Sequence, residues 1–350
     1  QCGVVRSNAV RWRYGRLARW QAALALYLVC IAGLTHAQPG GDVRRWLIEV
    51  NQAAKQQTFV GTMVVQSGSD MVSAKIWHID HGAQTYERVD LLSGEPHTTM
   101  RQGDLVFGVD HTAKLVRQER TSDLGLFPAV LGSAGRNVGQ HYVMQSLSAQ
   151  RVAGRDTVGV ALQAKDLWRH SYRIWRDKRS GLVLQWQTVS SHSGAVLEQV
   201  AYSDIVVAGG VDFAAMQAWQ RVPANYAVVV KDALKVQPSS MGWTQRAPVA
   251  GFEAGAVSKP QINGQAVEGA PAQWVFSDGL ASVSLFIEPS SARGARQPSA
   301  VHLGATTSVS ASVPPMWVTA VGEVPVATLR ALLGSVQFNG QLPHNKPMEP

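Results

Sequence analysis

The sequence predicts a mostly antiparallel α+β protein, with a large curved sheet first and a smaller sheet with a C-terminal helix after it. Three observations support this fold class. Short β-type runs follow one another with turn residues between them, and turns this close favour antiparallel neighbours over crossover helices. One amphipathic helical stripe precedes these runs, and the composition shifts after Gly209-Gly210. Hydrophobic residues make up 45% of the 350 residues and charged residues 16%, which is enough apolar material for folded cores.

The first segment has the pattern of a secretory signal peptide, in the order of a basic region, an apolar run and a small-residue exit. The apolar run extends from Trp20 to Leu34, and Ala37 is the small residue before Gln38. We therefore expect export, with cleavage between Ala37 and Gln38. The basic region contains no acid and carries Arg6, Arg11, Arg13, Arg16 and Arg19.

Two alternatives exist for this segment. An uncleaved membrane anchor is disfavoured because the apolar run is shorter than the roughly 20 residues that span a bilayer. A lipoprotein signal at Cys30 is disfavoured because Val29 stands where Gly or Ala is expected. Both cysteines, Cys2 and Cys30, lie in this segment, so the rest of the chain can form no disulfide. Without the five arginines the net charge falls from +8 to +3, which weakens a nucleic-acid-binding interpretation.

Residues 42–57 are predicted to form an amphipathic helix that packs on a sheet. Val43, Trp46 and Leu47 begin an apolar stripe at helical spacing, and Val50 continues it. Asp42 can accept a hydrogen bond from the free amides of the first turn. A partner-binding helix is the alternative interpretation of the same stripe.

The first domain is predicted to be a meander of strands. A segment over 123–139, rich in Gly and apolar residues without a clean period, is expected to be a loop with a short helix. The predicted strands cover residues 59–66, 71–79, 84–92, 98–101, 105–109, 157–163, 171–176, 182–189 and 195–205.

The second domain is predicted to follow a linker and to contain a β-hairpin. Asp212 can cap a short helix through residue 219, and residues 231–272 are rich in Pro, Gly, Ser and Ala. Asp278-Gly279 between two alternating runs is a strong hairpin signal. Strands are predicted over 305–313 and 316–321, and Pro325 suits the first turn of a closing helix. The predicted organisation is a signal peptide (1–37), a first domain (41–207), a linker (208–240), a second domain (241–339) and a disordered tail (340–350).

The sequence carries no recognisable catalytic pattern, and we expect no enzyme activity, no metal and no cofactor. Zinc-protease, nucleophile-elbow, phosphate-loop and dinucleotide signatures are missing from it. His78, Asp80 and His81 are the best metal candidates, but His81 points away from His78 on a strand, so a solvated strand end is the simpler interpretation. Asp177 lies among cations and is interpreted as the cap of a β-turn.

Aromatic residues give a candidate binding surface. Tyr172 and Trp175 lie on opposite faces of one predicted strand, and Trp186 lies on the next strand. One face is expected to pack on the helix that carries Trp46. The other could line an apolar ligand or partner surface, with Phe107 as a further candidate, or could be a second layer of core.

Several motifs in order resemble the RseB/MucB family of periplasmic sigma-E regulators. The resemblance runs from about Asp42 to Phe338. The motifs are Trp175-Arg176-Asp177, Gly181 to Gln185, Gly194 and Leu197-Glu198-Gln199 in the first domain, and Trp243, Gly251-Phe252, Ser277-Asp278-Gly279-Leu280 and Thr319 to Pro325 in the second.

This resemblance implies a LolA-like half-open β-barrel followed by the family's C-terminal domain. It also implies a periplasmic negative regulator that binds the periplasmic domain of a membrane anti-sigma factor of the RseA/MucA type. Binding would shield that factor from site-1 proteolysis, and lipid or lipopolysaccharide stress signals would release it. The competing hypothesis is a periplasmic lipid or lipoprotein carrier of the LolA type. The sequence leaves self-association open.

Overall fold

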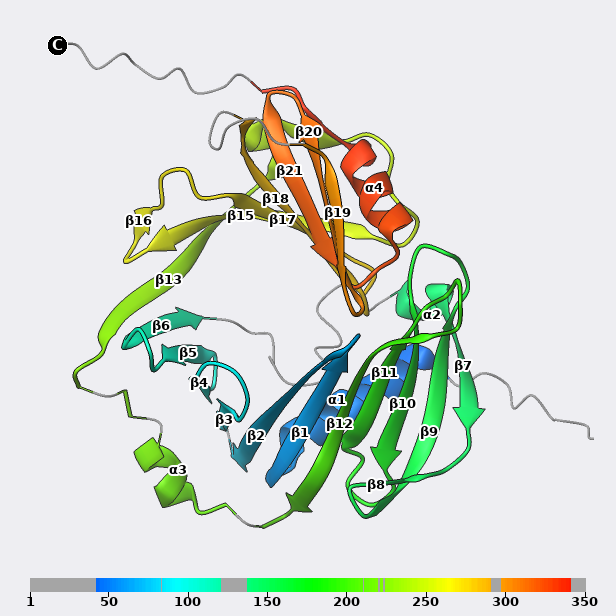
Figure 1. Ribbon diagram of the computed structural model, residues 1–350, viewed down its shortest axis with the longest axis vertical. Helices are drawn as coiled ribbons and strands as arrows, with labels where there is room; N and C mark the ends of the chain where they lie inside the picture. Colours follow the sequence, from blue (N-terminus) through cyan, green and yellow to red (C-terminus); the bar gives the residue numbers. More distant parts are fainter. Residues whose placement is uncertain are drawn as a thin grey trace, which may run out of the picture. The chain divides into compact units, whose positions relative to one another are not determined.

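The fold is seen in a computed structural model, which describes residues 42–340 except 83, 121–136, 210, 220, 223 and 291–296 (Figure 1). The predicted signal segment with Ala37 and Gln38, most of the predicted loop at 123–139 and residues 341–350 of the tail lie outside the described residues. The described residues all fall within one compact unit.

Eleven strands form a continuous antiparallel ladder in the first part of the chain, which we call the N-terminal sheet. The paired order is β7-β9-β10-β11-β12-β1-β2-β3-β4-β5-β6. Their bounds are β1 (Phe59–Ser67), β2 (Asp70–His81), β3 (Gln84–Leu91), β4 (His97–Gln102), β5 (Leu105–Asp110), β6 (Leu115–Arg120), β7 (Tyr142–Leu147), β9 (Arg155–Ala164), β10 (Ser171–Asp177), β11 (Val183–Val189) and β12 (Val196–Val207).

The N-terminal sheet is bent and open, as predicted. Its register shifts between Thr62 and Met63, between Trp175 and Arg176, and between Thr188 and Val189. Such bulges bend a strand and increase its twist. The sheet does not close, because β7 and β6 do not pair with each other in the described part of the chain. A short strand, β8 (Arg151–Val152), folds back on the start of β9.

Helix α1 (Val43–Gln56) packs on this sheet, as predicted from its apolar stripe. The Asp42 side chain accepts a hydrogen bond from the Arg45 amide at 3.2 Å. Trp46, Leu47 and Val50 are buried in one cluster with residues of β9, β10 and β11. Two further helices are short: α2 (Val138–His141) precedes β7, and α3 (Phe213–Trp219) starts after Asp212, whose carboxylate accepts from the Ala214 amide.

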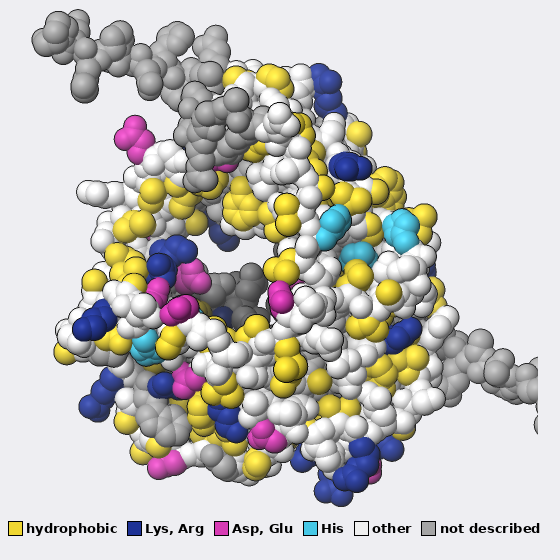
Figure 2. Space-filling model, viewed as in Figure 1, with side chains coloured by type: hydrophobic (Ala, Val, Ile, Leu, Met, Phe, Trp, Pro, Cys, Tyr) yellow, Lys and Arg dark blue, Asp and Glu magenta, His cyan; other side chains and the backbone are white. Residues whose placement is uncertain are grey.

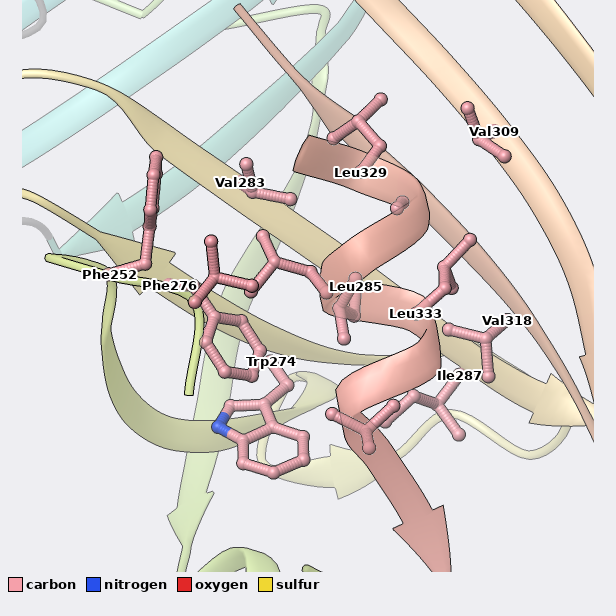
Figure 3. Packing of buried hydrophobic residues seen from close by; sticks show 14 of the residues in the cluster. Phe252, Trp274, Phe276, Val283, Leu285, Ile287, Val309, Val318, Leu329 and Leu333 are labelled. Carbon is pink, nitrogen blue, oxygen red and sulfur yellow. The ribbon is translucent and has the colours of Figure 1, made fainter. Parts of the chain in front are cut away.

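The C-terminal sheet has its own core. Its paired order is β15-β17-β18-β21-β20-β19, and α4 (Val326–Ser335) packs against it. In Figure 3, Leu329 and Leu333 of α4 lie among Phe276, Val283 and Leu285. The strands are β15 (Glu253–Ile262), β17 (Ala272–Ser277), β18 (Ser282–Pro289), β19 (Ser299–Leu303), β20 (Thr306–Val313) and β21 (Met316–Gly322). Smaller elements are η2 (Pro238–Met241), β14 (Trp243–Gln245), β16 (Gln265–Ala266) and β22 (Val336–Phe338).

The segment expected to be an irregular linker contains a strand that joins the two sheets. β13 (Ala227–Val236) pairs in parallel with β6 through residues 227–231 and antiparallel with β15 through residues 231–236. The composition of residues 231–272 suggests a linker, and the structure shows that this segment contains part of β13 and all of β15. Backbone ladder bonds stabilise β13, and its side chains are half-buried or exposed, so apolar periodicity gave little signal.

Candidate functional site

The turn between β9 and β10 carries a fully buried arginine. Arg169 has an exposed fraction of 0%, although it lies only three residues after an aspartate in a surface turn. The Asp166 carboxylate accepts from the Trp168 amide at 3.0 Å and from Arg169 Nε at 2.9 Å, so it fixes both the turn and the guanidinium. Burial by itself lowers the pKa of Arg169. The hydrogen bond to Asp166 and the charge of Asp278 outweigh burial, so the pKa is raised and the group stays charged.

The second charge of the site comes from the hairpin between β17 and β18. Asp278 is 1% exposed, and its Oδ2 lies 2.6 Å from Arg169 Nη1. The same oxygen accepts from the Tyr142 hydroxyl at 3.0 Å. Its Oδ1 accepts from the amides of Leu280 at 2.9 Å and Ala281 at 2.6 Å. The predicted hairpin is confirmed, but four residues separate its strands, and the aspartate closes this loop as well as pairing across the sheets.

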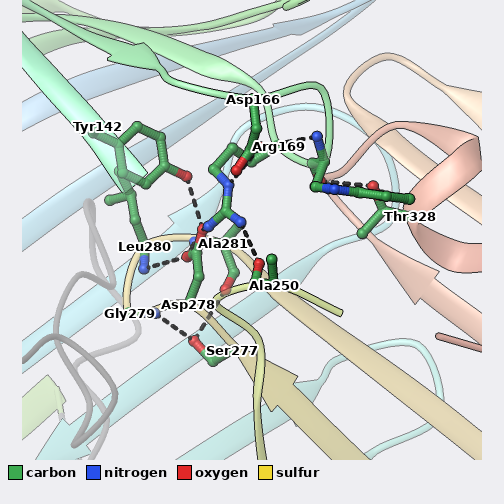
Figure 4. A network of polar contacts seen from close by, with 11 residues as sticks. Tyr142, Asp166, Arg169, Ala250, Ser277, Asp278, Gly279, Leu280, Ala281 and Thr328 are labelled. Carbon is green, nitrogen blue, oxygen red and sulfur yellow. Dashed lines mark hydrogen bonds and ion pairs between the residues drawn. The ribbon is translucent and has the colours of Figure 1, made fainter. Parts of the chain in front are cut away.

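Figure 4 shows how these contacts connect the two sheets. Arg169 Nη2 donates to the Ala250 carbonyl at 2.5 Å, so all three nitrogens of the guanidinium have an acceptor. The Thr328 hydroxyl of α4 donates to the Trp168 carbonyl at 2.6 Å. We call Tyr142, Asp166, Arg169, Asp278 and Thr328 the junction network. A buried ion pair with every partner in place adds little net stability, but removing one partner is costly because it leaves an uncompensated buried charge.

Apolar and close-packed contacts surround the junction network. The Arg169 guanidinium lies 5.1 Å from the ring centre of Phe252, and Leu280 packs against the buried cluster of the N-terminal sheet. Gly251 has a φ of +84°, and a Cβ built there would lie 2.5 Å from the His141 ring. Only glycine fits both the backbone angle and the space, so this position allows the sheets to approach closely.

Tyr142 connects the junction network to the aromatic residues predicted from the sequence. Its ring lies 6.0 Å from that of Tyr172, which in turn lies 4.8 Å from that of Trp186. Burial raises the pKa of Tyr142 well above its usual value, with Tyr172 and Asp278 adding to the effect, so its hydroxyl remains a donor. Tyr172 and Trp186 share their cluster with Trp46, which confirms the predicted packing on the helix.

The other two predicted surface residues lie elsewhere. Trp175 belongs to a different cluster, donates from Nε1 to the Ser148 carbonyl at 3.3 Å and lies over Gly159, where a Cβ would be 2.6 Å from that nitrogen. Phe107 is partly buried beside Met100. Tyr172, Trp175 and Trp186 are between 2% and 8% exposed, so in this arrangement they are core groups. Their role in lining a ligand surface stays a prediction.

The polar candidates have simple structural roles. His78 is 3% exposed, lies 2.7 Å from the Gln57 carbonyl and stacks on Phe59, so the expectation of a solvated strand end is wrong for it. His81 stacks on Phe213 instead. Among the described residues no group of three His, Cys, Asp or Glu side chains converges as a metal site. Asp177 caps its turn, as predicted, through the amide and hydroxyl of Ser180. In the described ranges no helix is long and apolar enough to cross a membrane.

Sequence reasoning missed Arg169, Tyr142 and Asp166, and it assigned Asp278 only to a turn. The partners in the ion pair are 109 residues apart, and neither lies in a local pattern that implies the other. The Asp-Gly signal found the hairpin but not its ionic partner.

Comparison with known proteins gives consistent matches over both sheets. A family model described as the MucB/RseB N-terminal domain matches residues 42–222, and one described as the MucB/RseB C-terminal domain matches residues 237–337. The sigma factor AlgU regulatory protein MucB of Pseudomonas aeruginosa is 25% identical over 311 residues, covering 86% of this chain and 92% of that protein. The sigma-E factor regulatory protein RseB of Haemophilus influenzae is 21% identical, covering 85% and 91%.

Solved structures match in fold. A crystal structure of MucB in complex with MucA(peri) aligns with a TM-score of 0.62 at 22% identity, covering 86% of this chain and 100% of that one. The complex structure of Pseudomonas aeruginosa MucA/MucB aligns with a TM-score of 0.65 at 22% identity, covering 85% and 99%.

Proposed function

Because the chain belongs to the MucB/RseB family, whose matched relatives are regulatory proteins and not enzymes, we propose that it regulates a sigma-E-type stress response by binding an anti-sigma factor. The proposed partner is the periplasmic domain of a membrane-bound anti-sigma factor of the RseA/MucA type, and the proposed compartment is the periplasm. The observation that carries this proposal is the match over both sheets to MucB, a protein solved in complex with MucA(peri).

The proposed mechanism is shielding. The bound regulator covers the anti-sigma factor and keeps the site-1 protease away, so the sigma factor stays inactive. A lipid or lipopolysaccharide signal that favours a form of the regulator unable to bind the anti-sigma factor shifts the population away from the complex. Such a signal acts only through its difference in affinity for the two forms.

The structure supports this mechanism because the contacts between the two sheets can hold them in one relative position. The two sheets share the strand β13 and the junction network, so their relative position depends on a small set of buried polar contacts. Separating the sheets takes Arg169 from Asp278 and from the Ala250 carbonyl, while each keeps only its local partners, which makes intermediate positions costly.

The direct test is a titration of the mature protein with the purified periplasmic domain of the anti-sigma factor from the same organism. We expect saturable binding, together with slower cleavage of that domain by the site-1 protease. Absence of saturable binding contradicts the proposal. Co-purified lipid, with no effect of gene deletion on stress-gene output, favours the alternative function as a lipid or lipoprotein carrier.

A further inference from the structure

A pocket of about 520 Å³ lies at the end of the β9–β10 hairpin opposite the junction network. In Figure 1 this is the end where β8 lies, away from α2, and ten residues of β9 separate the two ends by about 30 Å at the usual rise. We call it the cation pocket. Its lining residues are Arg151, Gly154, Arg155, Asp156, Asp177, Lys178 and Arg179.

Positive charge exceeds negative charge in the cation pocket. Four cations and two carboxylates line it, which leaves a net charge of +2. Figure 2 shows Lys and Arg side chains gathered over this end of the sheet. A concave site lined by one sign of charge concentrates counter-ions more strongly than the same charges on a flat surface.

One of the two carboxylates, that of Asp177, is engaged in hydrogen bonds and an ion pair within the protein. Asp177 is 2% exposed and accepts from the Ser180 amide at 2.8 Å and hydroxyl at 2.6 Å. It also lies 3.0 Å from Arg155 Nη2. Burial alone raises the pKa of Asp177, but the hydrogen bonds from Arg155 and Ser180 outweigh it and lower the pKa. The carboxylate therefore stays ionised and holds the Arg155 guanidinium in place.

Among the described residues, the remaining cations of the pocket have at most a weak carboxylate partner. Arg151 lies 3.9 Å from Asp156, and both side chains are 72% exposed, so this pair is weak. Lys178 and Arg179 are exposed and have no carboxylate within 4.0 Å in the part of the chain that the structure describes. In contrast, Arg120 elsewhere on the N-terminal sheet lies 2.6 Å from Asp104.

We propose that the cation pocket binds a phosphate-type anion, held by Arg155, Lys178 and Arg179 with Arg151 at the rim. The planar guanidinium offers paired donors that match phosphate geometry, and the ammonium group adds a point charge. Asp177 orients Arg155 before the ligand arrives, which reduces the entropy lost on binding. The pocket is larger than one phosphate group, so the anion can be free phosphate or the phosphate of a larger headgroup. This proposal is independent of the anti-sigma partner.

The test uses the mature protein and two charge-matched double variants. Lys178→Gln with Arg179→Gln removes two cations from the pocket, whereas Lys235→Gln with Lys259→Gln removes two exposed cations from β13 and β15. Inorganic phosphate is titrated at constant ionic strength, and amide chemical shifts around residues 154–156 and 177–181 report binding. Vesicles of phosphatidylglycerol and of phosphatidylcholine are tested in parallel. Circular dichroism checks that each variant is folded.

We expect saturable phosphate binding that weakens about tenfold or more in the pocket variant and not in the β13–β15 variant. Binding of phosphatidylglycerol vesicles that depends on the pocket residues, with phosphate alone bound weakly, identifies a headgroup as the source of the anion. Equal weakening in both variants means a general charge effect and overturns the proposal. Absence of binding to phosphate and to both vesicles also overturns it.

Discussion

At one end of the β9–β10 hairpin Arg169 is completely buried with an acceptor for each of its nitrogens, whereas at the other end Lys178 and Arg179 are exposed and form no ion pair with a carboxylate of the described residues. The strands are the same at both ends, so the difference comes from what covers them. The β17–β18 hairpin and α4 cover the first end and supply Asp278 and Thr328. A buried charged side chain needs a paired partner, which ties together the elements that supply the two groups. An exposed charged side chain remains available to a ligand.

The largest expected effect comes from breaking the buried pair. Arg169→Met keeps most of the side-chain volume but leaves Asp278 buried without its cation, so we expect the free energy of unfolding to fall by about 3–5 kcal/mol. Urea unfolding measures this value. The matched control is Arg151→Met at the open end, expected to change it by less than about 0.5 kcal/mol because that side chain is 72% exposed. Similar losses of unfolding free energy in both variants would contradict the difference between the covered and the open end.

Substitutions of Trp186 and Trp175 test whether the aromatic side chains of the N-terminal sheet line a ligand surface. Trp186→Ala and Trp175→Ala remove side chains that are 8% exposed, so each should cost about 3–5 kcal/mol of stability. If these residues also line an apolar ligand surface, binding of an apolar fluorescent dye falls more than in Trp243→Ala, which alters a tryptophan of the other core that is 1% exposed. Dye binding that falls equally in all three variants limits Trp175 and Trp186 to core packing.

The covered end should also be sensitive to acid, because His170 is buried there. Burial, with a smaller contribution from His192, lowers the pKa of His170 to about 4 from its ordinary value of 6.5. The unfolded chain therefore binds a proton more readily than the folded chain between these values. Stability should fall by up to about 3 kcal/mol as the pH falls from 6.5 to 4. The measurement is urea unfolding at several pH values, and His170→Phe should remove this loss.

A buried carboxyl group outside the hairpin, that of Glu87, should change the stability with pH in the opposite direction. Burial raises the pKa of Glu87 to about 7 from 4.5, although the charge of Arg101 opposes the shift. The folded chain then binds the proton more readily, so this group lowers stability as the pH rises from 4.5 to 7. The two groups offset each other in the wild type. Glu87→Gln should therefore steepen the loss of stability in acid that His170 causes, and an unchanged slope contradicts the assignment.

The fold was predictable where apolar residues recur at the period of a strand or a helix. The strands at 171–176 and 182–189 and the helix at 42–57 repeat apolar residues at the period of their own structure, and all three are confirmed. β13 and β15 were missed because backbone pairing stabilises them while few of their side chains are buried. Patterns of burial carry no signal for such strands.

The site was less predictable than the fold. Asp278 was found as a turn residue, since Asp-Gly has a local conformational meaning. Its pairing with Arg169 depends on how two distant hairpins pack, and no periodicity in the sequence encodes that contact. The cation pocket could have been suspected from Arg176-Asp177-Lys178-Arg179, but the approach of Arg151 and Arg155 to this turn follows from the path of β8 and β9.

The smallest expected effect lies at the open end and depends on the solvent. Lys178→Gln with Arg179→Gln should change the free energy of unfolding by less than about 0.5 kcal/mol in phosphate-free buffer, because neither side chain is buried. A ligand that binds only the folded state stabilises it in proportion to the logarithm of its concentration above Kd. Adding phosphate should therefore raise the Tm of the wild type more than the Tm of the variant. A destabilised variant without phosphate would mean that this turn holds the fold together, as the covered end does. An equal rise in both proteins would place the phosphate elsewhere.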